Sequence, residues 1–131
     1  MTDKQALLNY RIDQARDTLA DAEMMLKGGV SARSVINRAY YAMFYSIMAL
    51  FIHAGTAQKT SKHSGVISLF DKEFVHPGTI DRRYSKMMHK MFDARQESEY
   101  RELTKVSHEE AVESVRIAQE FFEEMRKFIE K

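Results

Sequence analysis

One apolar stretch carries polar side chains at helical spacing that are suited to binding a phosphate. The stretch runs from Ser31 to Gly55, and between Ala39 and Ile52 all residues except one serine are apolar or aromatic. Arg38, Tyr41 and Tyr45 follow one another at i, i+3 and i+7, so a helix would place a guanidinium and two phenols on one stripe. Because buried polar groups need partners, we expect this stripe to face other polar groups or an interface.

Two other segments carry cationic and phenolic side chains. The polar loop from Gly55 to Gly65 contains Lys62 and His63, and functional residues tend to lie on such loops. Farther along, Arg95 continues the inward row of a predicted helix, and Tyr100 follows in a polar stretch.

The predicted helix that ends near Arg95 is also strongly basic. Its cations outside the inward row are Arg82, Arg83, Lys86, His89 and Lys90. We interpret them as a solvated face, with a phosphate-binding surface as the alternative.

Standard metal and nucleophile sites are not supported by the sequence. A di-metal carboxylate bundle needs two Glu-x-x-His motifs and two further glutamates, whereas Glu73 to His76 is the only copy and adjoins Pro77. We find no Gly-rich phosphate loop and no nucleophile in a recognisable elbow. We therefore expect no metal and no cofactor.

The hydrophobic periodicity predicts an all-α fold. With one Pro and five Gly in 131 residues, few positions can break a helix. The stretch around Ser31 to Gly55 is hydrophobic on nearly all sides, so other helices must surround it. Its apolar run of about 14 residues is shorter than the roughly 20 needed to cross a bilayer.

We predict a single domain over residues 1–131, an up-and-down helical bundle of four long helices plus one short helix. Thr2 and Ser107 are expected caps of the first and last helices, and Thr79 of the fourth. The predicted helices are about Asp3 to Lys27, Ser31 to Gly55, Val66 to Val75, Ile80 to Glu97 and Ser107 to Ile129, with a loop from Glu97 to Val106.

Composition limits the class of protein further. The formal charge of +1 argues against a protein that binds nucleic acid over its whole surface, but it permits a local basic patch. The polar N-terminus, without a signal or transit pattern, predicts a cytoplasmic protein with no membrane partner.

Taken in order, the motifs resemble the HEPN domain family, in its small stand-alone form. The resemblance covers essentially the whole chain, and its most specific parts are the Arg-Ala-Tyr-Tyr-Ala element at Arg38 and the Arg-Gln-x-x-acid-Tyr element at Arg95. The other matching segments are Lys-Thr-Ser-Lys-His-Ser-Gly ending at Gly65, Phe-Val-His-Pro-Gly ending at Gly78, and Ser-His-Glu-Glu-Ala ending at Ala111.

The resemblance implies a helical bundle that is often a homodimer and that often pairs with a minimal nucleotidyltransferase as a toxin-antitoxin system. Active members cleave RNA without metal, using an Arg followed four to six residues later by His. Here Tyr100 follows Arg95 where an active member carries His, and a phenol with a pKa of about 10 is a poor general base near neutrality.

Three hypotheses follow. In the first, the chain is a dimeric RNA- or nucleotide-binding regulatory module whose cleft is lined by Arg38, Tyr41, Lys62, His63, Arg95 and Tyr100. In the second it is a metal-independent ribonuclease, with Arg95 holding the phosphate and His63, or else His108, moving a proton. In the third, a purely structural interaction module, the same side chains only hold the fold together.

Overall fold

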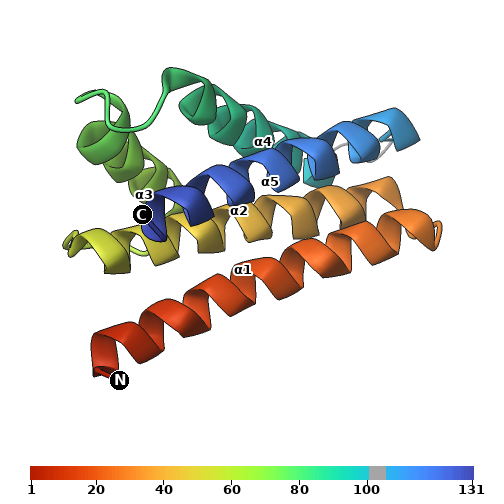
Figure 1. The fold of residues 1–131 in the computed structure, drawn as a ribbon. Coiled ribbons are helices and arrows are strands. Elements are labelled where there is room, and N and C mark those ends of the chain that lie inside the picture. Colours follow the sequence, from red (N-terminus) through yellow and green to blue (C-terminus); the bar gives the residue numbers. More distant parts are fainter. Residues whose placement is uncertain (101–105) are drawn as a thin grey trace.

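The computed structural model describes residues 1–100 and 106–131, and the side chain of Tyr100 lies outside that description. The described residues form an all-α bundle in which successive long helices run in opposite directions (Figure 1). The helices are α1 (Asp3–Lys27), α2 (Ala32–Ala54), α3 (His63–Phe70), the π-helical turn η1 (Asp71–Val75), α4 (Arg82–Tyr100) and α5 (His108–Ile129).

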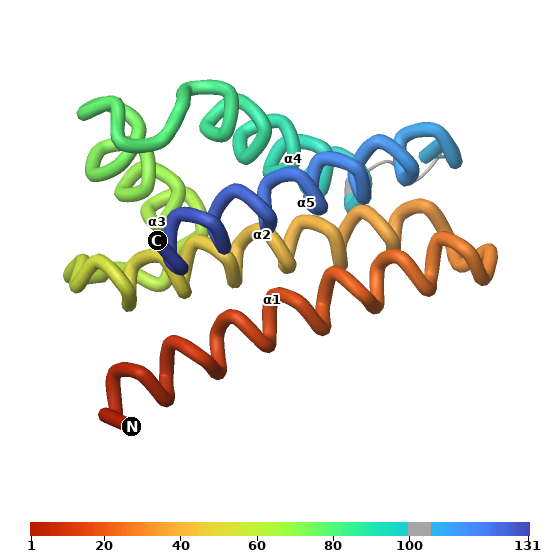
Figure 2. The backbone as a smooth tube through the Cα atoms, in the orientation of Figure 1, coloured from red at the N-terminus to blue at the C-terminus, as the bar shows by residue number. Residues whose placement is uncertain are grey.

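Helix α2 forms the centre of the bundle. Helices α1, α4 and α5 all pack against it, and the tube through the backbone shows α1 and α5 running along it (Figure 2). Its side chains Tyr40, Met43, Ile47 and Leu50 have no exposed surface. By length and composition α2 could also cross a membrane, but its most apolar window is 67% buried inside the fold. The other helices therefore cover the apolar surface that the sequence places on nearly all sides of α2.

Two of the three predicted helix caps are confirmed. The hydroxyl of Thr2 accepts a hydrogen bond from the Gln5 backbone N–H, and that of Ser107 accepts one from the Glu110 backbone N–H. Each bond satisfies one of the backbone donors that the first turn of a helix leaves without a partner. The Thr79 cap is wrong: α4 begins at Arg82, and Asp81 accepts from the Arg83 backbone N–H instead.

Two predicted boundaries also differ from the structure. The short helix begins at His63 rather than Val66, because the Lys62 carbonyl accepts a hydrogen bond from the Val66 N–H and so closes the first turn three residues earlier. Helix α4 continues through Tyr100, so the first part of the predicted loop from Glu97 to Val106 is helical. The remainder of that loop prediction, residues 101–105, lies outside the described residues.

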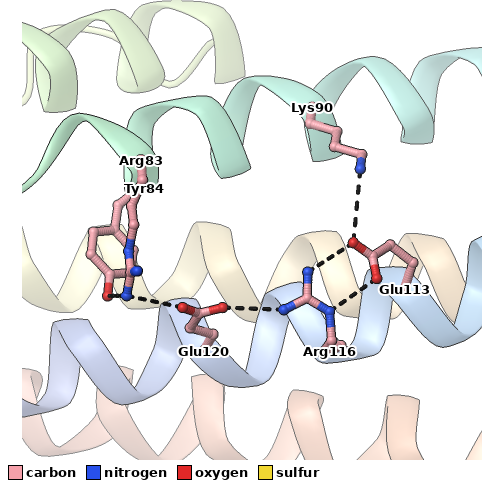
Figure 3. Close-up of polar contacts among 6 residues, drawn as sticks. All are labelled: Arg83, Tyr84, Lys90, Glu113, Arg116 and Glu120. Atoms are coloured by element: carbon pink, nitrogen blue, oxygen red, sulfur yellow. Dashed lines mark hydrogen bonds and ion pairs between the residues drawn. The ribbon is translucent and has the colours of Figure 1, made fainter.

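Helices α4 and α5 both pack on α2 but make few contacts with each other. Charged side chains join them across the gap, as Figure 3 shows: Arg83 pairs with Glu120 at 3.0 Å, and Lys90 with Glu113 at 3.9 Å. Arg116 lies between the two acids on α5 and bonds to both. Because these pairs are largely exposed, they add little to the stability of the bundle, and burial against α2 carries most of it.

Candidate functional site

The guanidinium of Arg95 enters the bundle from α4 and meets polar side chains of α2. Its Nε donates to Asn37 Oδ1 at 3.3 Å, and its Nη2 donates to the Tyr41 hydroxyl at 3.4 Å. A third contact is the ion pair with Glu99, one turn along α4, at 3.4 Å. The Arg95 side chain keeps 20% of its surface exposed, so solvent still reaches it.

Two tyrosine rings flank the same guanidinium. Arg95 Cζ lies 5.3 Å from the ring centroid of Tyr40 and 5.3 Å from that of Tyr41, which is within the range of cation–π attraction. These aromatic and amide partners hold the guanidinium without neutralising it. Within residues 1–100 and 106–131 its one carboxylate partner is Glu99, which is itself 43% exposed. Arg95 thus presents a positive charge in a site that is mostly shielded from water.

His63 reaches the same two tyrosines from the first turn of α3. Its Nδ1 lies 2.9 Å from the Tyr40 hydroxyl, and its ring is stacked on Phe44 with centroids 4.2 Å apart. The His63 ring centroid is 5.6 Å from those of both Tyr40 and Tyr41. His63 and Arg95 therefore both contact the Tyr40 and Tyr41 pair. We name the following set the Arg95–His63 cluster: Asn37, Tyr40, Tyr41, Phe44, His63 and Arg95.

Burial and charge set the protonation of this cluster. Burial lowers the pKa of His63, and the positive charge of Arg95 lowers it further. Burial raises the pKa of Tyr40, an effect that Arg95 opposes and Tyr41 reinforces. At neutral pH the imidazole is therefore uncharged and the Tyr40 phenol keeps its proton. The cluster then carries one cation, Arg95, beside a neutral group able to exchange a proton.

The other predicted site residues lie in different surroundings. Arg38 donates to Thr18 Oγ1 on α1 at 3.4 Å, because one residue beyond Asn37 the helix turns its side chain by about 100° away from α4. Although Arg38 and Tyr41 are only about 60° apart around α2, Arg38 bonds to α1 and Tyr41 accepts from Arg95 of α4, so the predicted stripe has partners on two different helices. Lys62 is exposed and directly precedes α3, where its backbone N–H donates to Thr60 Oγ1 at 3.1 Å. The side chain of Tyr100 is outside the described part of the chain.

Three residues of the cluster were not predicted from the sequence: Asn37, Tyr40 and Phe44. Asn37 and Phe44 stand at i−4 and i+3 from Tyr41, so the helical period places them on its face. That spacing was a signal for Asn37, the only polar residue at those positions. Tyr40 gave no such signal, since nothing in the sequence separates a fully buried tyrosine with a polar partner from an ordinary core aromatic.

Hollows elsewhere on the surface are separate from this cluster. The largest of those described, about 590 Å³, lies between α4 and α5 and is lined by apolar and acidic side chains, among them Met91 and Glu109, and by Lys90. Within residues 1–100 and 106–131, no group of three or more His, Asp or Glu side chains is arranged to hold a metal ion.

Comparison with known proteins agrees with the fold and with the family resemblance of the motifs. Residues 8–128 match the HEPN domain family, and the chain belongs to that family. It is 35% identical over 130 residues to a UPF0332 protein of Thermotoga maritima, covering 99% of this chain and 96% of the relative. A UPF0332 protein of Archaeoglobus fulgidus is 31% identical over 124 residues, covering 95% and 96%. A Methanocaldococcus jannaschii protein named "Putative toxin MJ0605" is 30% identical over 120 residues, covering 92% and 87%.

We predict that replacing Arg95 by Gln raises the pKa of His63, because the guanidinium charge is one of the two causes that lower it. NMR titration of the His63 imidazole protons measures the change. Arg16→Gln, which removes the same charge from α1, should leave the His63 pKa where it is. An unchanged pKa in Arg95→Gln would show that the two groups are not electrostatic neighbours.

The same shift has a consequence for stability. Since the folded-state pKa of His63 lies below its unfolded value of about 6.5, the unfolded chain binds the proton more readily. The free energy of unfolding should therefore fall as pH decreases below about 6.5, because the unfolded chain then gains the proton. Urea unfolding at several pH values measures this fall, and His63→Asn should reduce it. The exposed His76 provides the control variant, His76→Asn, which should leave the fall unchanged.

Proposed function

We propose that this HEPN-family protein is a dimeric module that binds the phosphate of RNA or of a nucleotide, and that it regulates a partner protein. The observation that carries the proposal is the position of Arg95. Its guanidinium is oriented by Asn37, Tyr40 and Tyr41, keeps its charge and remains partly exposed. A fork of N–H donors held in this way suits phosphate oxygens.

The surroundings of Arg95 fit a nucleotide as well as a bare phosphate. Tyr41 and Tyr45 are half-buried, and their rings lie 5.8 Å apart. Partly exposed aromatic rings beside a phosphate site are suitable for stacking bases, at about 1–3 kcal/mol per base. Lys62 adds an exposed positive charge next to His63. Tyr100 remains a predicted contributor, whereas Arg38 bonds to Thr18 on α1.

We predict that the protein binds a short single-stranded oligoribonucleotide at low salt and that Arg95→Gln weakens binding between about tenfold and a hundredfold. The reason is that a hydrogen bond to a charged group contributes about 1.5–3 kcal/mol. Fluorescence anisotropy measures the change. Arg16→Gln is the matched control, because Arg16 is an exposed arginine paired with Asp13 on α1. Absence of binding by the unaltered chain, or equal loss in both variants, would contradict the proposal.

A purely structural role for Arg95 predicts a different combination of stability and RNA binding. Arg95→Ala would then lower the free energy of unfolding by about 1–3 kcal/mol, since it leaves the partly buried Asn37 and Tyr41 without their donor, and would leave RNA binding unchanged. Chemical denaturation and anisotropy on the same variant separate the two roles.

The partner that we propose is a minimal nucleotidyltransferase protein, and the support for it is family membership. The name of the Methanocaldococcus jannaschii relative, which includes the word toxin, supports a toxin-antitoxin setting. Co-expression with the nucleotidyltransferase encoded nearest in the genome should yield a stable complex on size-exclusion chromatography, and the chain alone should elute as a dimer. A monomer that leaves the nucleotidyltransferase unbound would remove this part of the proposal.

A second candidate function is metal-independent cleavage of RNA, and the proximity of His63 to Arg95 favours it. An uncharged His63 can accept the 2′-hydroxyl proton at Nε2 if Nδ1 carries hydrogen and donates to the Tyr40 oxygen, while Arg95 stabilises charge on the phosphate.

We predict for this second function that RNA is cleaved in the presence of a chelator and that His63→Ala and Arg95→Ala each abolish cleavage. Gel analysis of a labelled RNA measures the cleavage, with His89→Ala as the control, because His89 pairs with Asp71 of η1 and not with the cluster. Cleavage that persists in both variants but stops in His108→Ala would move the proton transfer to the alternative residue.

A further inference from the structure

The basic face of α4 separates into paired and unpaired cations once partners are assigned. Arg83 and Lys90 pair with acids of α5 (Figure 3), and His89 pairs with Asp71 at 2.7 Å. Arg82 and Lys86 are exposed and make no ion pair or side-chain hydrogen bond with any residue of 1–100 or 106–131. Two of the five basic residues are thus uncompensated, although acids are plentiful on the neighbouring helix.

These two cations line one hollow. It has a volume of about 450 Å³ and lies where the end of η1 meets the start of α4, lined by Val75, His76, Arg82, Ser85 and Lys86. Arg82 and Lys86 stand at i and i+4 on one face of α4, and His76 approaches from the other element. The described lining contains no carboxylate.

The nearby acids are engaged elsewhere. The Asp71 carboxylate accepts from the Ser85 hydroxyl at 2.7 Å and contacts His89 with its other oxygen. The side chain of Asp81 accepts from the Arg83 backbone N–H at 2.9 Å. These contacts also fasten η1 to α4, so the hollow is formed by two elements that hold each other in place.

We propose that the hollow formed by His76, Arg82 and Lys86 is a phosphate-binding site, separate from the Arg95–His63 cluster. Lys86 and Arg95 are nine residues apart on α4, which turns their side chains to opposite sides of the helix. Arg95 faces α2, whereas Lys86 faces solvent. Binding at the two sites can therefore be tested independently, and loss of one does not imply loss of the other. The sequence pattern favours a solvated face for the basic residues of α4. Ion pairs with α5 account for Arg83 and Lys90, but not for Arg82 and Lys86.

The ligand class is a phosphate group, either free or within an RNA backbone. A guanidinium binds two phosphate oxygens at once, a lysine adds a mobile positive charge, and an imidazole on the opposite wall donates one more hydrogen bond. Because all three side chains are exposed, their removal has little effect on folding.

The test is an NMR titration of the full chain, labelled with ¹⁵N, using inorganic phosphate, ADP and an eight-nucleotide oligouridylate as separate probes. We expect chemical-shift changes at His76, Arg82 and Ser85. The double variant Arg82→Gln/Lys86→Gln should weaken binding at least tenfold. Two control variants, Lys90→Gln and Arg95→Gln, each replace a cation of the same helix outside the hollow by a neutral side chain. Both should leave the shifts at this hollow unchanged.

The probes distinguish the source of the phosphate. Binding of all three identifies a site for a single phosphate group, whereas binding of the oligouridylate alone identifies the RNA backbone. In that case the double variant should also reduce the salt dependence of log K, by about 0.7 per lost phosphate contact. No shift at the hollow with any probe, or equal weakening by Lys90→Gln and the double variant, would overturn the proposal.

Discussion

The structure depends on enclosing one helix that is apolar on nearly every side. Leu50 and Ile47 of α2 are completely buried, and each such side chain contributes about 1.5–3 kcal/mol when it leaves water. The exposed ion pairs contribute far less than this burial. Every long helix of the bundle therefore takes its position from α2, and the charged pairs between α4 and α5 adjust the spacing of helices that are already placed.

This constraint explains how Arg95 can be held near the core. A polar position on α2, Asn37, lies on the face that α4 covers, and a charge there needs partners once water is displaced. Amide, hydroxyl and aromatic groups of α2 provide those partners, and Glu99 of α4 adds a partly exposed carboxylate. His63, which the early start of α3 places here, has its pKa lowered by burial and further by the Arg95 charge, so it stays uncharged at neutral pH. Burial of α2 thus produces a cation beside a neutral imidazole as a consequence of packing.

The basic side chains of α4 face three different parts of the structure. Arg95 is directed to α2, Arg83 and Lys90 to the acids of α5, and Arg82 and Lys86 to a hollow beside η1. Only the first two directions have partners inside the described chain. A net charge near neutrality over the whole sequence is compatible with such local separation, because acids and bases on different helix faces do not compensate one another once a Debye length or the protein body lies between them.

The sequence by itself determined the helices and the face that each one buries. The inward rows of α1, α4 and α5 and the enclosed position of α2 follow from periodicity, because apolar side chains repeat with the helical turn. Sequence also pointed to Arg95 and His63, through position and family resemblance. Tertiary structure alone decided that Tyr40, which the sequence does not distinguish from a core aromatic, contacts both of them. It also decided that Arg38 bonds to α1 and that α3 starts at His63. The reason is physical: periodicity specifies a direction around one helix axis, whereas a contact depends on how two axes are placed relative to each other, and that placement is set by the packing of the whole core.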